Sequence, residues 1–390
     1  MCSTICATNI KMHYMNVLRN PFLIYGYESP AYFCGREKET EKLASALRNG
    51  RNVTLMSPRR MGKTGLIKNT FYRIHSEMPE AICLYMDIYS TTSLQEFIKL
   101  FGSVVLGNGG TTSQRFLEKV RSFIKSCKMV FSANPITGAP EVSLDFQPSE
   151  SEATLKEIFD YLVYSGKEYF IAIDEFQQIA EYNDSKTVEG LLRSFIQFCP
   201  NLHFVFSGSK SHLMSEIFDK PGHPFYRSTE KMHIGVLNMD EYYQFAKSKM
   251  ETNGIVLSRD AFEKIYNQFC GHTWYIQYML NKIYEFRPKN VTQEVINECI
   301  VDIVESNKED YQRSFILLTS NQQQLLRAIA KEKNVVNING NEFIKKYGLK
   351  GSSSINRAIS ALINKEYVYR YAEGYQVYDR FMQLWLVTLP

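Results

Sequence analysis

The sequence of 390 residues predicts an α/β fold with a mostly parallel sheet over residues 31–232, followed by two helical regions. Short apolar runs alternate with segments of helical periodicity up to residue 232, which favours strands joined by helices. Residues 238–305 then show helical spacing without a convincing strand. From residue 320 onward, helical patterns precede two short strand-like runs, at residues 367–371 and 374–378.

Four short β-prone runs predict the central sheet. They are residues 51–56 (RNVTLM), 81–88 (AICLYMDI), 169–173 (YFIAI) and 202–206 (LHFVF), each too short for a free-standing helix. Helical spacing over residues 65–74 follows the first run after a loop. The beginning of the domain is therefore predicted as strand, loop and helix.

The long insert between the second and third runs is predicted to decorate the sheet. Residues 107–113 (GNGGTTS) have the composition of a loop. Residues 130–146 resemble two strands around the turn at 134–138 (NPITG). We therefore expect a hairpin near residues 128–147.

These patterns divide the chain into four predicted parts. They are an N-terminal segment (1–30), an α/β core (31–232), a helical lid (233–308) and a C-terminal domain (309–390). Three helices followed by two strands are the order of a winged helix, so we expect that fold in the last part.

Composition excludes several classes of protein. With 44% hydrophobic and 22% charged residues, the chain matches a globular protein rather than a disordered or collagen-like one. No stretch approaches the roughly 20 apolar residues of a membrane-spanning helix, and no secretory signal is evident, so we expect no membrane contact. The eight cysteines form no CxxC pair, which favours free thiols and a cytoplasmic location.

The strongest chemical signal is residues 57–64 (SPRRMGKT), which fit the phosphate-loop pattern GxxxxGK[ST] with Ser57 in place of the first Gly. Backbone N–H groups of such a loop bind phosphate, Lys63 reaches the β and γ phosphates, and the Thr64 hydroxyl completes a Mg²⁺ shell. The residues expected to bind the nucleotide are Ser57, Pro58, Arg59, Arg60, Met61, Gly62, Lys63, Thr64 and Gly65.

A second signal is the run 169–177 (YFIAIDEFQ), an apolar strand that ends in two acids. Asp174, at the strand end, is expected to hold Mg²⁺ through water, and Glu175 to polarise the attacking water as general base. A buried strand that happens to end in an acidic turn is common, but its pairing with Lys63 predicts a nucleoside triphosphate site.

Two weaker candidates lie further along the chain. The fourth strand leads into residues 207–209 (SGS), where the hydroxyl of Ser207 or of Ser209 could orient water or sense the γ-phosphate. Turn chemistry explains the same residues equally well. Arg227 could stabilise charge on the transferred phosphoryl group, or it is a solvated arginine in an ion pair.

The chain resembles the archaeal-type ATPase family, which belongs to the AAA+ and STAND-like P-loop proteins, over nearly its whole length. The motifs that carry the resemblance are YFCGRE (32–37), SPRRMGKT (57–64), IDEFQ (173–177), FSGS (206–209), FYR (225–227) and YQVYDRFMQLWL (375–386). The resemblance implies ATP as the nucleotide, places Gly35 and Arg36 near the adenine, and places Arg227 near the phosphates.

The resemblance also assigns residues 270–277 (CGHTWYIQ) to a motif of the helical lid. Here Cys270 replaces a Gly and Thr273 replaces a Pro of the family pattern. His272 and Trp274 are expected to pack within the lid, because a single His or Trp in a helical pattern is usually part of a core.

The C-terminal domain raises the question of DNA binding. Residues 310–390 carry 11 Lys and Arg against 6 Asp and Glu, an excess that permits nucleic-acid binding without requiring it. Residues 352–363 (SSSINRAISALI) would be the helix that enters a major groove. The candidate contacts within residues 340–370 include Lys345, Lys346, Lys350 and Arg357. Winged helices also dock proteins.

These observations predict an ATPase that binds ATP and Mg²⁺, hydrolyses ATP slowly and uses the ATP cycle to switch the position of the winged helix. The residues expected to act in turnover are Lys63, Glu175, Ser209 and Arg227, with Thr64 and Asp174 at the metal. Low turnover is expected if an activating arginine comes from a protein partner or a second copy. Two alternatives remain: a nucleotide-gated DNA-binding regulator and an ATP-stabilised scaffold with little turnover.

Overall fold

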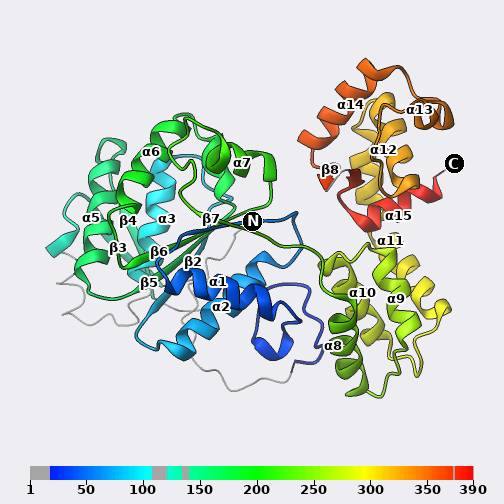
Figure 1. Cartoon of the computed structure of the whole chain (residues 1–390), viewed down its shortest axis with the longest axis horizontal. Helices are drawn as coiled ribbons and strands as arrows, with labels where there is room; N and C mark the ends of the chain where they lie inside the picture. The colour runs from blue at the N-terminus through cyan, green and yellow to red at the C-terminus, as the bar shows by residue number, and fades with distance from the viewer. Residues whose placement is uncertain (1–17, 108–119, 121, 134–139, 372–373, 390) are drawn as a thin grey trace. The chain divides into compact units, whose positions relative to one another are not determined.

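The computed structural model describes residues 18–107, 120, 122–133, 140–371 and 374–389 (Figure 1). The chain forms two compact units. The first contains the described residues within 18–19 and 25–236, and the second contains those within 20–24 and 237–389.

The first unit is built on a parallel sheet, as the sequence predicts. Its strands are β1 (Val53–Met56), β2 (Ile82–Asp87), β5 (Tyr169–Asp174), β6 (Leu202–Gly208) and β7 (Glu230–His233), in the spatial order β2-β5-β6-β1-β7. Each neighbouring pair is parallel, so the carboxyl ends of the strands share one edge. At that edge Asp87 is paired with Asp174, and Met56 with Gly208.

The edge strand β7 was not predicted from the sequence, which indicates four strands rather than five. Its residues, EKMH, are mostly polar, and Met232 is the buried one. β2 is also an edge strand, but its sequence keeps an apolar run, whereas β7 lacks the continuous apolar run by which β1, β5 and β6 are recognised.

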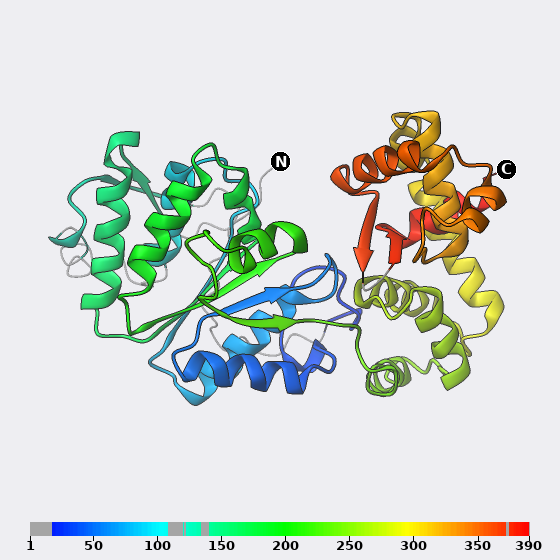
Figure 2. The same cartoon turned by 45° about the horizontal axis from the view of Figure 1, so that its top comes forward.

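Helices cover both faces of the sheet (Figures 1 and 2). On one face α1 (Glu37–Arg48) and α2 (Lys63–Glu77) pack on alternate strand residues such as Phe170 and Ala172. The opposite face packs on the intervening residues Ile171 and Ile173. Its helices are α3 (Leu94–Gly107), α5 (Ser151–Tyr164), α6 (Ser185–Ile196) and α7 (Ser211–Asp219). Short 3-10 turns η1 (Pro30–Tyr32), η2 (Pro148–Glu150) and η3 (Phe176–Glu181) complete the unit.

The predicted hairpin is present as β3 (Lys128–Ala133) and β4 (Pro140–Asp145), which pair antiparallel. It rests on α3, where a Cβ at Gly102 would overlap the side chain of Leu144. The predicted turn at 134–138 lies outside the described residues. Of the loop predicted at 107–113, Gly107 ends α3 and the remainder is also outside them.

The second unit begins with helices that the apolar spacing predicts. These are α8 (Met239–Glu251), α9 (Arg259–Gln268), α10 (Thr273–Phe286) and α11 (Gln293–Ile316). The side chains of Asn238, Ser258 and Thr292 accept backbone N–H bonds at the starts of α8, α9 and α11, which fixes where these helices begin. The predicted boundary between residues 308 and 309 falls inside α11.

The C-terminal part of the second unit is a winged helix. It contains α12 (Ser320–Glu332), α13 (Asn341–Tyr347), α14 (Ser352–Asn364), β8 (Val368–Tyr371) and β9 (Gly374–Val377) in the predicted order. A final helix, α15 (Arg380–Thr388), was not predicted, although Asp379 caps its first turn. Trp385 of α15 packs on Tyr311 and Phe315 of α11.

Aromatic side chains join α10 to the winged helix within the second unit. Phe381 lies 5.3 Å from the ring of Tyr275 and 6.4 Å from that of Trp274, centroid to centroid. The indole N–H of Trp274 donates to the Ile24 carbonyl at 2.8 Å, and His272 is buried. The contacts of Trp274 and the burial of His272 agree with the expected packing role.

Candidate nucleotide-binding and hydrolysis site

The phosphate-loop motif lies in the loop between β1 and α2, and a glycine permits the backbone conformation at the end of this loop. Gly62 has φ of 92°, a left-handed conformation that favours glycine, and α2 begins at the next residue. Ser57 is not among the residues with positive φ, so the absence of a glycine at this position costs no backbone strain. The departure from the consensus is therefore compatible with the loop geometry.

Lys63 is a buried cation held by neutral acceptors. Its side-chain ammonium donates to the carbonyls of Ser57 at 2.9 Å and Pro58 at 3.2 Å. Burial lowers the pKa of Lys63, and the nearby Asp174 and Glu175 oppose that shift. Phosphate oxygens would give the ammonium stronger, charge-assisted bonds than these carbonyls do.

Thr64 and Asp174 bring the two sequence motifs into contact. The Thr64 hydroxyl donates to Asp174 Oδ2 at 3.0 Å, although the residues lie 110 positions apart. The Tyr85 hydroxyl donates to the same oxygen at 2.6 Å, and the Glu175 N–H donates to Asp174 Oδ1 at 3.0 Å. Burial, with a contribution from Asp174, raises the pKa of Tyr85, so its phenol remains a donor.

The oxygen atoms of Thr64 and Asp174 fit a magnesium ion. Mg²⁺ prefers hard oxygen ligands, usually one or two protein oxygens with several waters. A hydroxyl and a carboxylate that already touch, at the carboxyl edge of the sheet and beside Lys63, are that donor set.

Glu175 is held by two donors on one carboxylate oxygen. Ser209 Oγ donates to Glu175 Oε2 at 2.8 Å, and Gln177 Nε2 donates to the same oxygen. Glu175 itself has a left-handed φ of 55°, which turns the chain sharply after β5. Of the two hydroxyls that the sequence leaves open, Ser209 is the one that reaches this acid. The Ser207 hydroxyl is fully buried, without a hydrogen-bond partner among the described residues.

Asp87 belongs to the same edge but was missed by sequence reasoning. It ends β2 directly beside Asp174 in the sheet. Although its side chain is exposed, partial desolvation raises the pKa of Asp87 to about 6. The Tyr89 N–H opposes this pKa shift, the charges of Asp174 and Glu175 add to it, and Arg59 also opposes it. An acid after a short strand is indistinguishable from a solvated turn until the strand order places it next to Asp174. Tyr85 was missed because it lies within a strand, and Gln177 because the motif 173–177 contains it without indicating its role.

Arg36 is buried against the phosphate loop. Its guanidinium donates to the Met61 carbonyl at 3.0 Å and to the Gly235 carbonyl at 2.8 Å, and it pairs with Glu39 at 3.2 Å. Arg36 and Gly35 both have positive φ. Arg36 therefore connects the loop to the segment that follows β7.

Gly35 and Gly65 both lie near Phe33. Gly35 and Phe33 line an open pocket with Asn69 and Tyr72, and a Cβ at Gly65 would lie 3.1 Å from Phe33 Cε2. The Asn69 side chain accepts a hydrogen bond from a tyrosine hydroxyl at 2.9 Å and donates to a threonine. The pocket therefore combines an aromatic ring with an amide next to the phosphate loop.

Arg227 does not join this site through any contact described for it. It is exposed, its backbone N–H donates to the Phe218 carbonyl at 3.1 Å, and its guanidinium lies 5.2 Å from the Tyr226 ring centroid. Its expected role at the phosphates stays a prediction.

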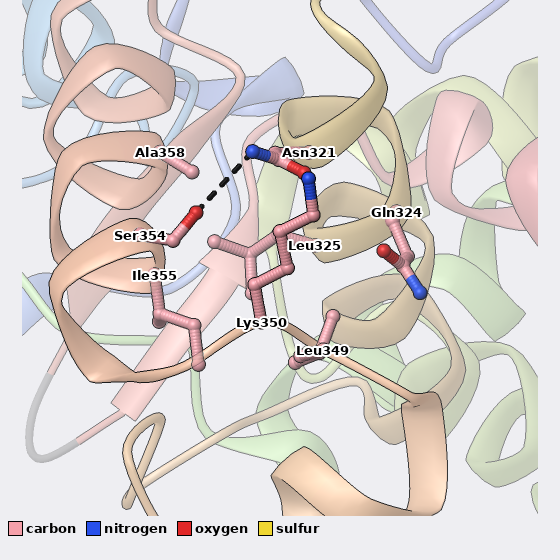
Figure 3. A pocket seen from close by; sticks show the side chains of 8 residues that line it. All are labelled: Asn321, Gln324, Leu325, Leu349, Lys350, Ser354, Ile355 and Ala358. Atoms are coloured by element: carbon pink, nitrogen blue, oxygen red, sulfur yellow. Dashed lines mark hydrogen bonds between the residues drawn. The ribbon is translucent and has the colours of Figure 1, made fainter.

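The winged helix presents a polar face on α14. Ser353, Asn356, Arg357 and Ser360 are exposed, while the opposite side of the helix is buried. Lys346 is paired with Glu332 at 2.6 Å. Figure 3 shows the small pocket between α12 and α14, where Asn321 donates to Ser354 at 3.2 Å. It lies beneath the polar face and forms part of the packing of the domain.

A buried lysine at the start of α2, a hydroxyl and two acids at the carboxyl edge of a parallel sheet define a P-loop nucleoside triphosphatase fold. A family model described as an ATPase domain predominantly from Archaea matches residues 33–279, and a probable winged helix domain matches residues 309–388. The chain belongs to this archaeal-type ATPase family, and membership implies that it binds ATP.

Solved structures show the same fold at low sequence identity. The Walker-type ATPase of Pyrococcus abyssi is 16% identical, with a TM-score of 0.64 over 94% of this chain and 99% of that one. The ORC2 protein of Aeropyrum pernix, solved as ADPNP-ADP complexes, is 16% identical, with a TM-score of 0.59 over 95% and 96%. The ORC1 protein of Aeropyrum pernix, solved in complex with DNA, is 13% identical, with a TM-score of 0.54 over 94% and 96%.

No curated protein matches the chain. Within the described residues, no helix combines the length and the apolar character needed to cross a membrane.

Proposed function

We propose that the protein binds Mg·ATP at the β1–α2 loop, hydrolyses it slowly and uses the ATP cycle as a conformational switch that acts on the winged helix. The observation that carries the proposal is the 3.0 Å hydrogen bond between Thr64 and Asp174, because it joins two independently recognised motifs at one edge of the sheet.

Lys63 and the first turn of α2 would bind the β and γ phosphates. The N–H groups at the start of a helix have no intrahelical partner, and the helix dipole favours an anion there. Lys63 would exchange the carbonyls of Ser57 and Pro58 for phosphate oxygens. Arg59 and Arg60 add positive charge to the same loop, and the remaining loop residues would supply backbone contacts.

Thr64 and Asp174 would hold the magnesium ion, Thr64 through its hydroxyl oxygen and Asp174 through water. Mg²⁺ supplies charge neutralisation at the phosphates when it is bound. Tyr85 and the Glu175 N–H would keep the Asp174 carboxylate oriented, because each already donates to one of its oxygens.

Glu175 would act as the general base. It would accept a proton from the water that attacks the γ-phosphorus while the bond from that phosphorus to the bridging oxygen breaks. Ser209 shares the oxygen Oε2 with Gln177 and could turn its hydroxyl to the γ-phosphate. The pocket of Phe33, Gly35 and Asn69 would bind the adenine. Arg36 would stabilise the loop through its hydrogen bond to the Met61 carbonyl.

Slow turnover is expected because Arg227 contacts Phe218 and Tyr226 rather than the acids of the site. An arginine that stabilises the transferred phosphoryl group can accelerate hydrolysis by roughly 10³ to 10⁵. A rearrangement of Arg227, a protein partner or a second copy of the chain would have to supply it.

Packing within the second unit supports the switch. Phe381 of α15 contacts the aromatic rings of α10, so a displacement of α10 would move the winged helix with it. ATP can drive such a change only as far as it binds one arrangement more tightly than the other.

The test is phosphate release from the full chain with Mg·ATP, beside Lys63→Ala and Glu175→Gln. We expect Lys63→Ala to lose nucleotide binding, and Glu175→Gln to bind ATP but to lose at least 100-fold in turnover, the order of effect of a general base. Turnover equal to the parent in both variants would refute the assignment. Nucleotide binding without release in the parent would leave a switch that needs a partner.

DNA binding is a second candidate, favoured by the exposed polar face of α14 and by the likeness to the ORC1 protein solved with DNA. Duplex affinity that falls steeply with salt and drops further in Lys345→Ala, Lys350→Ala and Arg357→Ala would support it. Lys346→Ala should matter less, because Glu332 already pairs with Lys346.

A scaffold for a protein partner is the third candidate. In that case Glu175→Gln would abolish hydrolysis and leave the biological output unchanged.

A further inference from the structure

We propose that Gln177 is a positioning residue for hydrolysis, which holds the Glu175 carboxylate in place while Ser209 turns to the γ-phosphate. The inference rests on the proposed function, in which Glu175 is the general base. It is carried by the contacts of Gln177, the last residue of the motif IDEFQ (173–177), to which the sequence assigns no role.

The geometry assigns two donors to a single oxygen. Ser209 Oγ, at the end of β6, and Gln177 Nε2, in η3, both donate to Glu175 Oε2. No hydrogen bond to the other oxygen, Oε1, is found among the described residues. Oε1 is therefore the oxygen able to accept a proton from water, and the two donors fix the direction in which it points.

Close packing restricts the Gln177 side chain. Its side chain is buried, at 2% exposure. Its neighbour Phe176 packs with its ring 4.6 Å from that of Phe206 and 5.6 Å from that of Phe225, centroid to centroid. A Cβ at Gly208 would overlap the Gln177 side chain, so β6 leaves room for this amide by having glycine there. A buried amide between two packed elements has little rotational freedom.

The orientation of the amide also points to a role toward Glu175. Gln177 Oε1 is buried, without a hydrogen-bond partner among the described residues. A buried carbonyl left unpaired is unfavourable, and the opposite orientation would place that carbonyl against the Glu175 carboxylate. The charge-assisted bond to Glu175 therefore determines which way the amide faces.

The two donors have different tasks if one of them senses phosphate. Ser209 has one hydroxyl proton, so it cannot donate to the γ-phosphate and to Glu175 at once. Gln177 has no such second task, because its side chain is buried, with its amide oxygen beside Gly208. When Ser209 turns, Gln177 is the donor that keeps Glu175 aligned.

The test replaces the amide by a side chain of similar shape that cannot donate. We expect Gln177→Met to lower kcat for ATP by about 10- to 100-fold, the order seen for supporting partners of a site, with KM and the affinity for a fluorescent ATP analogue within a factor of three of the parent. The matched control is Gln178→Met. Gln178 is the same residue type one position along, only partly buried, and no side-chain contact is described for it. It should keep the parent kcat.

A double-mutant cycle separates positioning from structure. If Gln177 acts through Glu175, then Gln177→Met should have no further effect on the residual single-turnover hydrolysis of Glu175→Gln. Losses that multiply, an unchanged or raised kcat in Gln177→Met, or a parallel loss of nucleotide affinity would each overturn the proposal. Unimpaired hydrolysis in Glu175→Gln alone would instead overturn the proposed function.

A second variant keeps the proposal testable if Gln177→Met does not fold. Gln177→Glu preserves the shape and places an acceptor against the Glu175 oxygen. It should lower kcat at least as far as the methionine variant, again without weakening nucleotide binding. A Gln177→Glu protein that binds ATP and turns it over at the parent rate would refute the proposal.

Discussion

Individual residues at the edge of the sheet show which parts of the site the sequence reveals. Lys63 and Asp174 were predicted because each belongs to a local pattern, a loop before a helix or an acid after an apolar strand. Asp87 carries no local pattern, and Gln177 closes the motif IDEFQ (173–177) without a role that the sequence assigns. They join the site only because β2 lies beside β5, and because η3 turns back against Gly208. Chemistry that depends on strand order is not visible in a single sequence.

Lys63 is expected to destabilise the folded protein when no nucleotide is bound. Its pKa is lowered by burial, which means that the folded state disfavours the charge that phosphate binding requires. Lys63→Met keeps the aliphatic length and removes the charge. We expect it to raise the free energy of unfolding without nucleotide by about 1 to 3 kcal/mol.

The measurement is urea unfolding of the parent and Lys63→Met, with and without Mg·ATP. The parent should gain stability from ATP and the variant should not. A variant less stable than the nucleotide-free parent would show that Lys63 stabilises the loop.

Asp87 should make stability depend on pH. Its pKa is about 6 in the folded protein against 3.8 for the free side chain, so the folded state binds more protons between these values. Stability contributed by protonated Asp87 is present below pH 3.8 and is lost as pH rises through 6. After allowance for solvent screening, Asp87→Asn should be more stable than the parent by about 1 kcal/mol at pH 7.5.

Denaturant midpoints of the parent and Asp87→Asn from pH 4 to pH 8 measure this effect. The difference should vanish at the acidic end of the series. A difference that stays constant over the whole range would indicate that the substitution acts by packing rather than by charge.

Among the elements, the sequence predicts those whose pattern reflects their own burial. β1, β5 and β6 are buried along their length and were found. Of the two edge strands, the apolar β2 was found and the polar β7 was missed. The last helix, α15, was also missed. Its buried residues include Arg380 and Gln383. The terminal guanidinium nitrogens of Arg380 donate to Gln383 and to residues of β8 and β9, and Gln383 donates to a carbonyl of α12. Polar residues that are buried with partners conceal the helical apolar stripe.

The packing of η3 against β6 predicts a large effect of one methyl group. Gly208→Ala would drive a Cβ into Gln177 and Met214 at the carboxyl edge of the sheet. We expect a loss of about 1 to 3 kcal/mol in the free energy of unfolding from overpacking.

Gly190 provides the matched control for this substitution. It lies within α6, where a Cβ would meet Pro224 at an ordinary distance of 3.9 Å. Because alanine is the better helix former, Gly190→Ala should be neutral or stabilising by up to about 1 kcal/mol. Equal unfolding midpoints for the two variants would contradict the close packing at Gly208.

At the scale of the whole molecule, the division into two units separates the proposed chemistry from the proposed output. The residues assigned to phosphate and metal lie in the first unit, and the winged helix lies in the second. The sequence already predicted an α/β core before helical regions. It did not predict that α10 and α15 share one aromatic cluster, because their residues lie about a hundred positions apart. The apolar pattern of one helix contains no information about which distant helix it packs against.

The aromatic cluster around Phe381 leads to the last prediction. Phe381 contacts Phe269, Tyr275 and Tyr278 and is 3% exposed, so Phe381→Ala removes the ring through which α15 meets α9 and α10. Large-to-small changes of this kind cost about 3 to 5 kcal/mol. We expect the loss to fall on the second unit, so that the variant still binds a fluorescent ATP analogue while residues 237–389 become sensitive to protease.

Calorimetry of the full chain, with and without Mg·ATP, measures the midpoint temperature of each unfolding transition. The two units are distinguished by which change shifts each midpoint. ATP should raise the midpoint temperature of the unit that contains Lys63, and Phe381→Ala should lower the midpoint temperature of the second unit. A single transition that both ATP and Phe381→Ala displace would mean that the units unfold together. In that case nucleotide energy would reach the winged helix through the stability of the whole chain, rather than through a movement of α10.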